Sequence, residues 1–461
     1  MAPKITRPFC AQLGKCLQQV TSGQATQLNA GCVVTQKQMV NLTIVNSTFK
    51  VFPAGALQSQ VAAFSTSASR KSSVSQPPAR LLQPLTVPNK ILMGPGPSNA
   101  YPRVLAAGSL PLIGHLQTEF YEIMDDIKAG IQYLFQTENE WTFAISGTGM
   151  AAMEAAAVNL LEVGDVALVG VNGFWGARLA EIAERNGSVA QRIEKPMGQV
   201  LSLEEIEQGL KEHKPKIVFL TYGESSGGTA QPLKGVGELC HKYGALLMVD
   251  SVAIVGGPYT NSVFCDFPGI DVLYTGAQKV LGSPPSISPI SFSQRARDKI
   301  ASRKTKVRSF YFDAAELANY WGCDEGPRRY HHTGMISGNY TLREGLAEIA
   351  EKGLEKSWEQ HSTCSQLLYD GLEKLGLELL VKDKSIRNPC VTVIKVPEGV
   401  DAKAVSDYAM DKHQTEIAGG FGYLAGKVWR IGVMGYNCTP ERVDQTLAVL
   451  KEALDLHWKR N

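Results

Sequence analysis

The chain has 461 residues, of which 44% are hydrophobic and 20% are charged, and its formal net charge at pH 7 is +2. These values are typical of a globular protein with a large core, and they give no sign of nucleic acid as a partner. No run reaches the roughly 18 apolar residues of a membrane span. The nine cysteines lack the spacing of a disulfide framework or of a metal site, so we expect reduced thiols.

The N-terminal stretch differs in composition from the rest of the chain. No Asp or Glu precedes Glu119, whereas Lys and Arg recur, and Ser, Thr, Gln and Ala are frequent. This composition is typical of a mitochondrial transit peptide, and the Ser-rich run after Phe64 resembles a processing region, with a cut expected between about residues 60 and 80. A tail without a targeting role is the alternative. The C-terminal Lys-Arg-Asn461 is not a peroxisomal address of the Ser-Lys-Leu type, so we predict a mitochondrial matrix protein.

Strand-like and helical patterns alternate along the next part of the chain. Apolar runs occur at residues 142–145, 166–171, 216–222, 245–250 and 272–275. Helical patterns separate them, for example at 174–186 and 203–212. Repeated strand and helix units with continuously apolar strands predict an α/β fold, in which helices cover both faces of a mostly parallel sheet. In such a sheet, ligands bind at the carboxyl ends of the strands.

The pattern changes after about Gly338. A long amphipathic helix is predicted first, then a strand at 390–396, a helix from Ala402, a strand around Arg430 and a last helix from Pro440. This favours a smaller C-terminal α/β domain. We therefore predict three regions: a leader at 1–80, an N-terminal arm with a large domain at 81–337, and the small domain at 338–461.

Ser146 to Gly149 form a Ser-Gly-Thr-Gly turn between a strand and an Ala-rich helical run. A turn of this kind at the N-terminus of a helix binds anions, because free backbone N–H groups and the positive end of the helix dipole converge there. Taken alone, the motif is a weak signal, since most such clusters are plain turns. Trp175 follows the next strand among glycines, where an indole can stack on a flat ring, although a Trp more often belongs to the core.

Asp250 and Lys279 close two consecutive strand-like runs. An aspartate in this position is often a turn former, and a lysine is usually a solvated surface charge. Lys279, however, stands in the uncharged context Tyr-Thr-Gly-Ala-Gln, with no carboxylate nearby in the sequence. Pyridoxal phosphate requires this pair of residue types: a lysine that holds the aldehyde as a Schiff base and a carboxylate that keeps the pyridine nitrogen protonated.

Several motifs together resemble those of the alanine–glyoxylate (serine–pyruvate) aminotransferases, a class V, fold type I pyridoxal-phosphate family. The resemblance runs from about Leu81 to the last helix, and its motifs occur in the order S-G-T-G, N-G-F-W-G, T-Y-G-E-S-S-G-G, L-L-M-V-D-S-V, G-A-Q-K, R-R-Y-H-H-T and K-V-W-R-I-G. It implies a fold type I transferase with a large domain and a smaller C-terminal domain.

The resemblance also implies roles for individual residues. Lys279 is the Schiff-base lysine, Asp250 is the partner of the pyridine nitrogen, and Trp175 stacks on the ring. The phosphate is held by Thr148, Gly149 and Gln278, with Ser225 near the cofactor. Arg430 clamps the substrate carboxylate, a role that suits its planar, permanently charged fork. Tyr330 and Thr333 reach the cofactor phosphate of the neighbouring subunit, which makes a homodimer with a shared active site the catalytic unit.

The reaction that the resemblance implies moves an amino group from alanine or serine to glyoxylate, giving glycine and pyruvate or hydroxypyruvate. Small neutral substrates are expected, because no second arginine is apparent for a dicarboxylate. Met150 departs from the pattern: some relatives have His directly after the phosphate-loop glycine, so a polar contact near the cofactor is missing. The Gly- and Pro-rich loop at 94–99 resembles a segment that lies near the substrate in this family.

Three other functions remain open at the level of sequence. A 3-hydroxykynurenine transaminase of the same family uses the same residues on a bulky aromatic donor. A pyridoxal-phosphate lyase such as a cysteine desulfurase needs a reactive cysteine on a mobile loop, and Cys323 reads more readily as a packed residue. A non-catalytic scaffold would not need Asp250, Lys279 and Arg430 together. The sequence does not rank alanine against serine as the donor.

Overall fold

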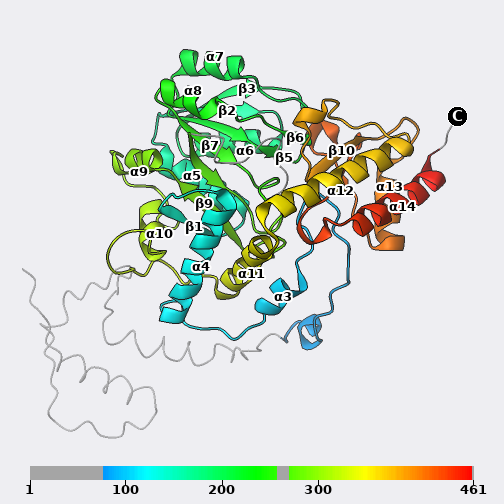
Figure 1. Ribbon diagram of the computed structural model, residues 1–461, viewed down its shortest axis with the longest axis horizontal. Helices are drawn as coiled ribbons and strands as arrows, with labels where there is room; N and C mark the ends of the chain where they lie inside the picture. Colours follow the sequence, from blue (N-terminus) through cyan, green and yellow to red (C-terminus); the bar gives the residue numbers. More distant parts are fainter. Residues whose placement is uncertain (1–75, 257–268, 459–461) are drawn as a thin grey trace, which may run out of the picture. The chain divides into compact units, whose positions relative to one another are not determined.

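The computed structural model describes residues 76–256 and 269–458 (Figure 1). The chain divides into two compact units, Met1–Thr86 and Val87–Asn461. In the first unit, the described residues contain one 3-10 helix, η2 (Ala79–Leu82), none of whose residues is buried. The predicted processing region after Phe64 lies outside the described residues. The second unit contains all the other elements and is the subject of the following paragraphs.

A seven-stranded sheet with the order β1-β9-β8-β7-β4-β2-β3 forms the centre of the second unit. Its strands are β1 (Trp141–Ser146), β2 (Val166–Val171), β3 (Val189–Glu194), β4 (Ile217–Thr221), β7 (Leu246–Asp250), β8 (Ile270–Tyr274) and β9 (Ile287–Phe292). Only β9 runs antiparallel to its neighbours, β1 and β8, while the remaining neighbours pair in parallel. The predicted mostly parallel α/β sheet is confirmed. A two-stranded ribbon, β5 (Gly223–Glu224) with β6 (Thr229–Ala230), follows β4.

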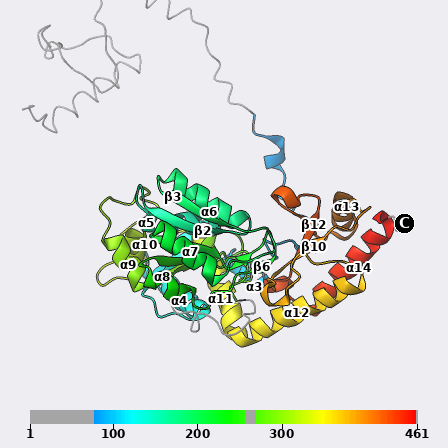
Figure 2. The same cartoon turned by 90° about the horizontal axis from the view of Figure 1, so that it is seen from above.

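Helices cover the sheet in two layers (Figures 1 and 2). Helix α5 packs against α6, and α7 packs against α8. Helix α6 connects β2 to the edge strand β3, and α7 leads back from β3 to β4 on the other side of β2. Because these two crossovers run in opposite directions across the sheet and both are expected to be right-handed, α6 and α7 lie on opposite faces. The helices of this part are α3 (Pro102–Ala107), α4 (Thr118–Phe135), α5 (Gly149–Leu160), α6 (Phe174–Arg185), α7 (Leu203–His213), α8 (Val236–Lys242), α9 (Gln294–Ala301), α10 (Ala314–Tyr320) and α11 (Ile336–Lys352).

The C-terminal part has its own sheet and its own hydrophobic cluster. Its strands pair antiparallel in the order β10-β12-β11. Buried Trp429, Ile431, Leu368 and Leu450 belong to this second cluster, and α12 leads into it from the large sheet (Figure 1). Its elements are α12 (Leu354–Lys374), β10 (Val391–Lys395), α13 (Ala402–His413), β11 (Ala418–Gly419), β12 (Val428–Gly432) and α14 (Pro440–His457).

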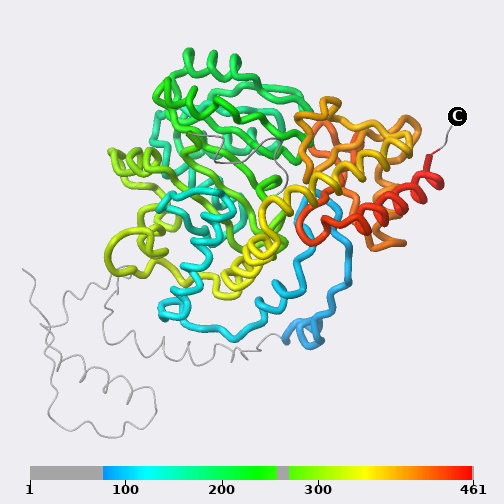
Figure 3. Tube along the Cα trace, viewed as in Figure 1, coloured from blue at the N-terminus to red at the C-terminus, as the bar shows by residue number. Residues whose placement is uncertain are grey.

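An extended arm after Val87 runs along this C-terminal part (Figure 3). Ile91 N–H donates to the carbonyl of Gln414 at 2.8 Å, and Gly432 N–H donates to the carbonyl of Met93 at 2.7 Å. The arm is therefore held by backbone hydrogen bonds, which brings the loop at 94–99 next to residues more than three hundred positions later in the chain.

The structure corrects the prediction of one long helix after Gly338. Two helices occur instead, α11 and α12, because Gly353 between them has φ +86°, a conformation that ends a right-handed helix and that glycine adopts readily. Strand β3 was not predicted, since it lies at the sheet edge and is largely exposed or half-buried. The predicted boundary at 337/338 falls inside α11, and the domain division stays a prediction.

Among the described residues, no helix combines the length and apolar character needed to cross a membrane. Within the same residues, no group of three or more His, Cys, Asp or Glu side chains is arranged to hold a metal ion.

Candidate active site

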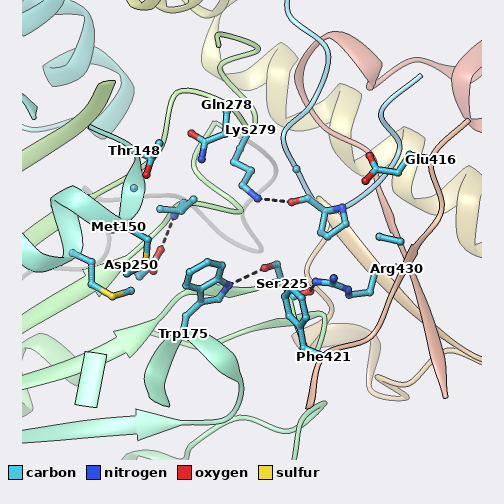
Figure 4. Close-up of a pocket in the computed structure, with 16 residues that line it drawn as sticks. Thr148, Met150, Trp175, Ser225, Asp250, Gln278, Lys279, Glu416, Phe421 and Arg430 are labelled. Atoms are coloured by element: carbon cyan, nitrogen blue, oxygen red, sulfur yellow. Dashed lines mark hydrogen bonds between the residues drawn. The ribbon is translucent and has the colours of Figure 1, made fainter. Parts of the chain in front are cut away.

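A cavity of about 390 Å³ opens at the carboxyl ends of the parallel strands (Figure 4). This volume is in the range of small-molecule and cofactor sites. The residues that line it come from strand ends of the large sheet, from the N-terminal arm and from the C-terminal sheet: Pro95, Gly96, Thr148, Gly149, Met150, Met153, Trp175, Ser225, Asp250, Val252, Gln278, Lys279, Glu416, Ala418, Phe421 and Arg430.

One end of the cavity is suited to an anion. Helix α5 begins at Gly149, and its N-cap residue, Thr148, makes no side-chain capping hydrogen bond. The first N–H groups of a helix have no partner within the helix, and the helix dipole adds positive potential there. Gln278 lines the same cavity, and its buried Oε1 has no hydrogen-bond partner. A phosphate fits this end of the cavity, because it can accept from the helix N–H groups and from the Nε2–H groups of the Gln278 side-chain amide.

Asp250 is buried at the end of β7. Its Oδ1 accepts from Val252 N–H and its Oδ2 accepts from the Tyr274 hydroxyl, each at 2.9 Å. Burial raises the pKa of Asp250 to about 7, although both hydrogen bonds act in the opposite direction. A cation bound beside this carboxylate would favour its ionised form. The protonated nitrogen of a pyridine ring is such a cation.

Lys279 reaches the cavity from the loop after β8 and is buried. Its Nζ donates a 2.5 Å hydrogen bond to the carbonyl of Pro95. Burial, and secondarily the charge of Arg430, lowers the pKa of Lys279 to about 8, while Asp250 and Glu416 oppose this shift. An amine with this pKa is partly neutral near physiological pH, so it can act as a nucleophile or as a base.

Trp175 lines the wall of the cavity and is held there by two hydrogen bonds. Its indole N–H donates to Ser225 Oγ at 3.0 Å, and its backbone N–H donates to Glu224 Oε2 at 3.2 Å. Glu224 is fully buried, and burial raises the pKa of its carboxyl group. Glu224 also accepts from the backbone N–H and the hydroxyl of Ser226. One hydrogen bond thus holds the indole ring and another holds the Trp175 backbone, an arrangement that suits stacking on a flat ring.

Arg430 lies at the opposite side of the cavity from Asp250 (Figure 4). It is only 4% exposed, yet it forms no ion pair with any described residue. Its Nε donates to the carbonyl of Gly419 at 2.7 Å, and Nη1 donates to the carbonyl of Ser225 at 3.4 Å. The ring of Phe421 covers the guanidinium at 4.1 Å. Burial lowers the pKa of Arg430 to about 10, with Glu224 and Glu416 opposing the shift.

The structure brings together all of the predicted site residues except Tyr330 and Thr333. Both of these are exposed and do not line the cavity of their own chain. Sequence reasoning missed Glu224, Glu416 and Phe421. Glu224 stands in the quoted T-Y-G-E-S-S-G-G motif, where its position after an apolar strand was a usable signal. Glu416 and Phe421 lie in a polar, glycine-containing stretch between α13 and β12 that reads as ordinary loop.

A buried aspartate at a strand end, a buried lysine in the loop after the next strand, an anion cradle and an indole beside them define, on this fold, a site of the fold type I transferase class. The Aminotransferase class-V family matches residues 100–438. The chain belongs to this family, whose members depend on pyridoxal phosphate.

Individual relatives agree with this assignment. The chain is 54% identical over 378 residues to the alanine–glyoxylate aminotransferase of Felis catus, covering 82% of this chain and 91% of that protein. It is 52% identical to the corresponding enzyme of Callithrix jacchus, with the same coverage. Among solved structures, the alanine–glyoxylate aminotransferase of Nostoc sp. superposes with a TM-score of 0.79 at 46% identity, covering 83% of this chain and all of that chain.

Proposed function

We propose that this protein binds pyridoxal phosphate in the cavity and transfers the amino group of alanine or serine to glyoxylate. The observation that carries the proposal is Arg430, a buried cation without an ionic partner among the described residues, which lines the same cavity as Lys279. Buried charges are normally paired. A bound carboxylate is the partner that would complete this site, and amino and keto acids both carry one.

The chain's own residues support transamination as follows. When bound, pyridoxal phosphate supplies the electron sink that stabilises negative charge at the substrate's α-carbon. The helix N-terminus at Gly149, together with Thr148 and Gln278, would hold its phosphate, and Trp175 would stack on its ring. Asp250 would keep the ring nitrogen protonated.

On the substrate side, Arg430 would hold the carboxylate through its fork, which fixes the orientation of the α-carbon. Lys279 Nζ, freed from its covalent role, would take the α-proton as a general base and return it to the cofactor side. The lowered pKa of Lys279 suits this role, because a base is most effective when its pKa lies near the operating pH.

The names of the relatives support glyoxylate as the acceptor and alanine as a donor. They do not favour 3-hydroxykynurenine. A cysteine desulfurase is not supported either, because Cys323 lies after α10 and does not line the cavity, and burial raises the pKa of its thiol to about 11. Such a thiol is a poor nucleophile.

A panel of donors tests the proposal. Purified protein with bound cofactor would be assayed with glyoxylate and, in turn, alanine, serine and 3-hydroxykynurenine. We expect the highest kcat/KM with alanine or serine. A higher kcat/KM with 3-hydroxykynurenine would identify the protein as a transaminase of that aromatic donor instead. Absence of glycine formation with every donor would contradict the proposed transfer to glyoxylate.

We further propose that the protein is a homodimer whose active sites are shared. The support comes from exposed apolar side chains near the two predicted residues that do not reach their own cavity. Leu112, Phe310 and Tyr330 are 71%, 65% and 60% exposed. His115, in the loop that follows α3, packs against Tyr330: the centroids of the two rings are 5.6 Å apart. Exposed apolar patches of this kind mark interfaces.

Complementation tests the shared site. A Lys279→Ala subunit lacks the reactive amine, and a Tyr330→Ala/Thr333→Ala subunit lacks the proposed contacts to the neighbouring cofactor. In a mixed dimer, one active site receives an intact set of residues, so activity should reappear on co-expression. No recovery in a purified mixed dimer, or a monomer by light scattering, would contradict the proposal.

A mitochondrial location is likewise a proposal, supported by the acid-free, basic composition that precedes Glu119. Residues 1–80 fused to a fluorescent protein should direct it to mitochondria. A diffuse signal from the fusion would contradict the targeting role.

A further inference from the structure

The cavity contains a carboxylate that the proposed mechanism does not use. Glu416 stands between α13 and β11 and lines the cavity together with Arg430 and Lys279. In the close-up it lies on the same side as Arg430, away from Thr148 and Asp250 (Figure 4). It is therefore on the side of the cavity where the substrate would bind rather than where the cofactor phosphate and ring nitrogen would lie.

Two features hold the Glu416 side chain in place. Its Oε2 accepts from the backbone N–H of Gly94 at 3.3 Å. A Cβ atom at position 94 would lie 2.6 Å from the Glu416 carboxyl carbon and 2.7 Å from Oε1, so the glycine leaves the space that the carboxylate occupies. The backbone at 416 is anchored as well, because its N–H donates to the carbonyl of Ile91 at 2.8 Å.

The Glu416 charge is not neutralised by an ion pair. None of the described basic side chains lies within ion-pair distance of Glu416. Its charge nevertheless acts on Lys279 and Arg430, because it partly opposes the lowering of their pKa values by burial. Lys279 and Arg430 are the only basic residues among those that line the cavity. Under the proposed function the first is engaged with the cofactor and the second with the α-carboxylate, so no cation remains for another carboxylate.

We propose that Glu416 is a specificity-determining residue that excludes amino and keto acids with an acidic side chain. This inference rests on the proposed transamination at the same site and deepens it, since it restricts the substrate class to neutral side chains. A second carboxylate on the substrate would meet a fixed like charge instead of a partner. Selectivity of this kind comes from a repulsive element as much as from attractive contacts.

A comparison of L-glutamate with L-glutamine isolates the effect of charge, because the two donors have nearly the same shape. Glu416→Gln removes the charge and keeps an acceptor for Gly94 N–H. In this variant the ratio of kcat/KM for glutamate to kcat/KM for glutamine should be about tenfold or more higher than in the wild type, which is the size expected for removal of one nearby like charge. Glu416→Asp should retain the wild-type preference. Glu398→Gln, an exposed position outside the cavity, controls for net charge and should change nothing.

Equilibrium binding gives a second readout without turnover. The dissociation constants of glutarate and of its half-amide, measured by calorimetry, should shift in Glu416→Gln by a similar factor in favour of glutarate. An unchanged preference in both measurements would overturn the inference, as would glutamate remaining unreactive in every variant. Alanine–glyoxylate activity, measured in the same preparations, reports separately on the proposed function. If this activity is present and the preference between glutamate and glutamine is unchanged, only the role of Glu416 is contradicted.

Discussion

Lys279 Nζ and the carbonyl oxygen of Pro95 are joined by a 2.5 Å hydrogen bond between residues 184 positions apart. The contact places the N-terminal arm directly over the reactive amine. Gly96, with φ +115°, allows this approach, since a Cβ atom there would overlap the Lys279 side chain. The loop at 94–99 therefore shapes the active site.

Gly96→Ala should impair Lys279 specifically. The added methyl group would displace the amine, so we expect slower covalent attachment of pyridoxal phosphate and a loss of transamination of about tenfold or more, as expected for misplaced reacting groups. Gly376→Ala is a matched control, because Gly376 also has a positive φ, +76°, with no atom near its Cβ position. Both variants should lose about 1–2 kcal/mol of stability, measured by thermal unfolding, and only Gly96→Ala should lose cofactor attachment. Equal activity in the two variants would contradict the argument.

Asp250→Asn should leave a folded protein with little activity. The amide keeps the shape and can still accept from Val252 N–H, but it cannot stabilise a positive charge on the cofactor ring. We expect kcat to fall about 100-fold or more, a typical cost of removing a preorganised electrostatic contact. Tyr274→Phe, which removes one hydrogen bond from Asp250 and keeps its carboxyl group, should show a smaller loss. Wild-type turnover in Asp250→Asn, with circular dichroism unchanged, would exclude the proposed role.

Arg430→Lys should weaken substrate binding while cofactor binding is unchanged. Lysine keeps the charge and loses the bidentate fork, and the loss of one charge-assisted hydrogen bond costs about 1.5–3 kcal/mol. KM for alanine and for glyoxylate should each rise about tenfold or more. Arg442→Lys, at an arginine on α14 that bonds Gln445, serves as the control. Unchanged KM values at full cofactor occupancy would show that Arg430 is not the carboxylate clamp.

Cofactor attachment should depend on pH through Lys279. The neutral amine is the nucleophile, and the Lys279 pKa of about 8 lies below that of an ordinary lysine. The neutral form is therefore populated at lower pH than usual, and the rate of covalent attachment to cofactor-free protein should rise about tenfold from pH 6 to pH 7 and level off above about pH 8.

Stopped-flow absorbance, followed by borohydride reduction and mass analysis of the Lys279 peptide, measures this rate. Because Arg430 helps to lower the Lys279 pKa, Arg430→Gln should move the inflection to higher pH. A wild-type rate that still rises at pH 10 would indicate an unperturbed lysine.

The sequence by itself determined the buried parallel strands and the aspartate that ends one of them. Predicted run 166–171 coincides with β2, and run 245–250 covers β7, because continuous apolar segments of this length have few other stable arrangements than buried parallel strands. Asp250 lies at the carboxyl end of such a strand, β7, where ligands of a parallel sheet bind. The turn at Thr148 reaches the same edge through two antiparallel pairings of β9, with β1 and with β8. The place of Asp250 follows from local pattern and general geometry, whereas the place of the Thr148 turn depends also on β9, which no apolar run predicted.

Only the tertiary structure decided what closes the cavity on its other sides. Pro95 arrives on an arm held by Met93 and Ile91, while Glu416 and Phe421 arrive from the C-terminal part. No periodicity in the sequence predicts that these residues line the cavity, because their positions depend on backbone pairing between segments hundreds of residues apart. The pKa of Lys279 has the same origin: burial and the approach of Arg430, rather than any feature of the local sequence, lower it.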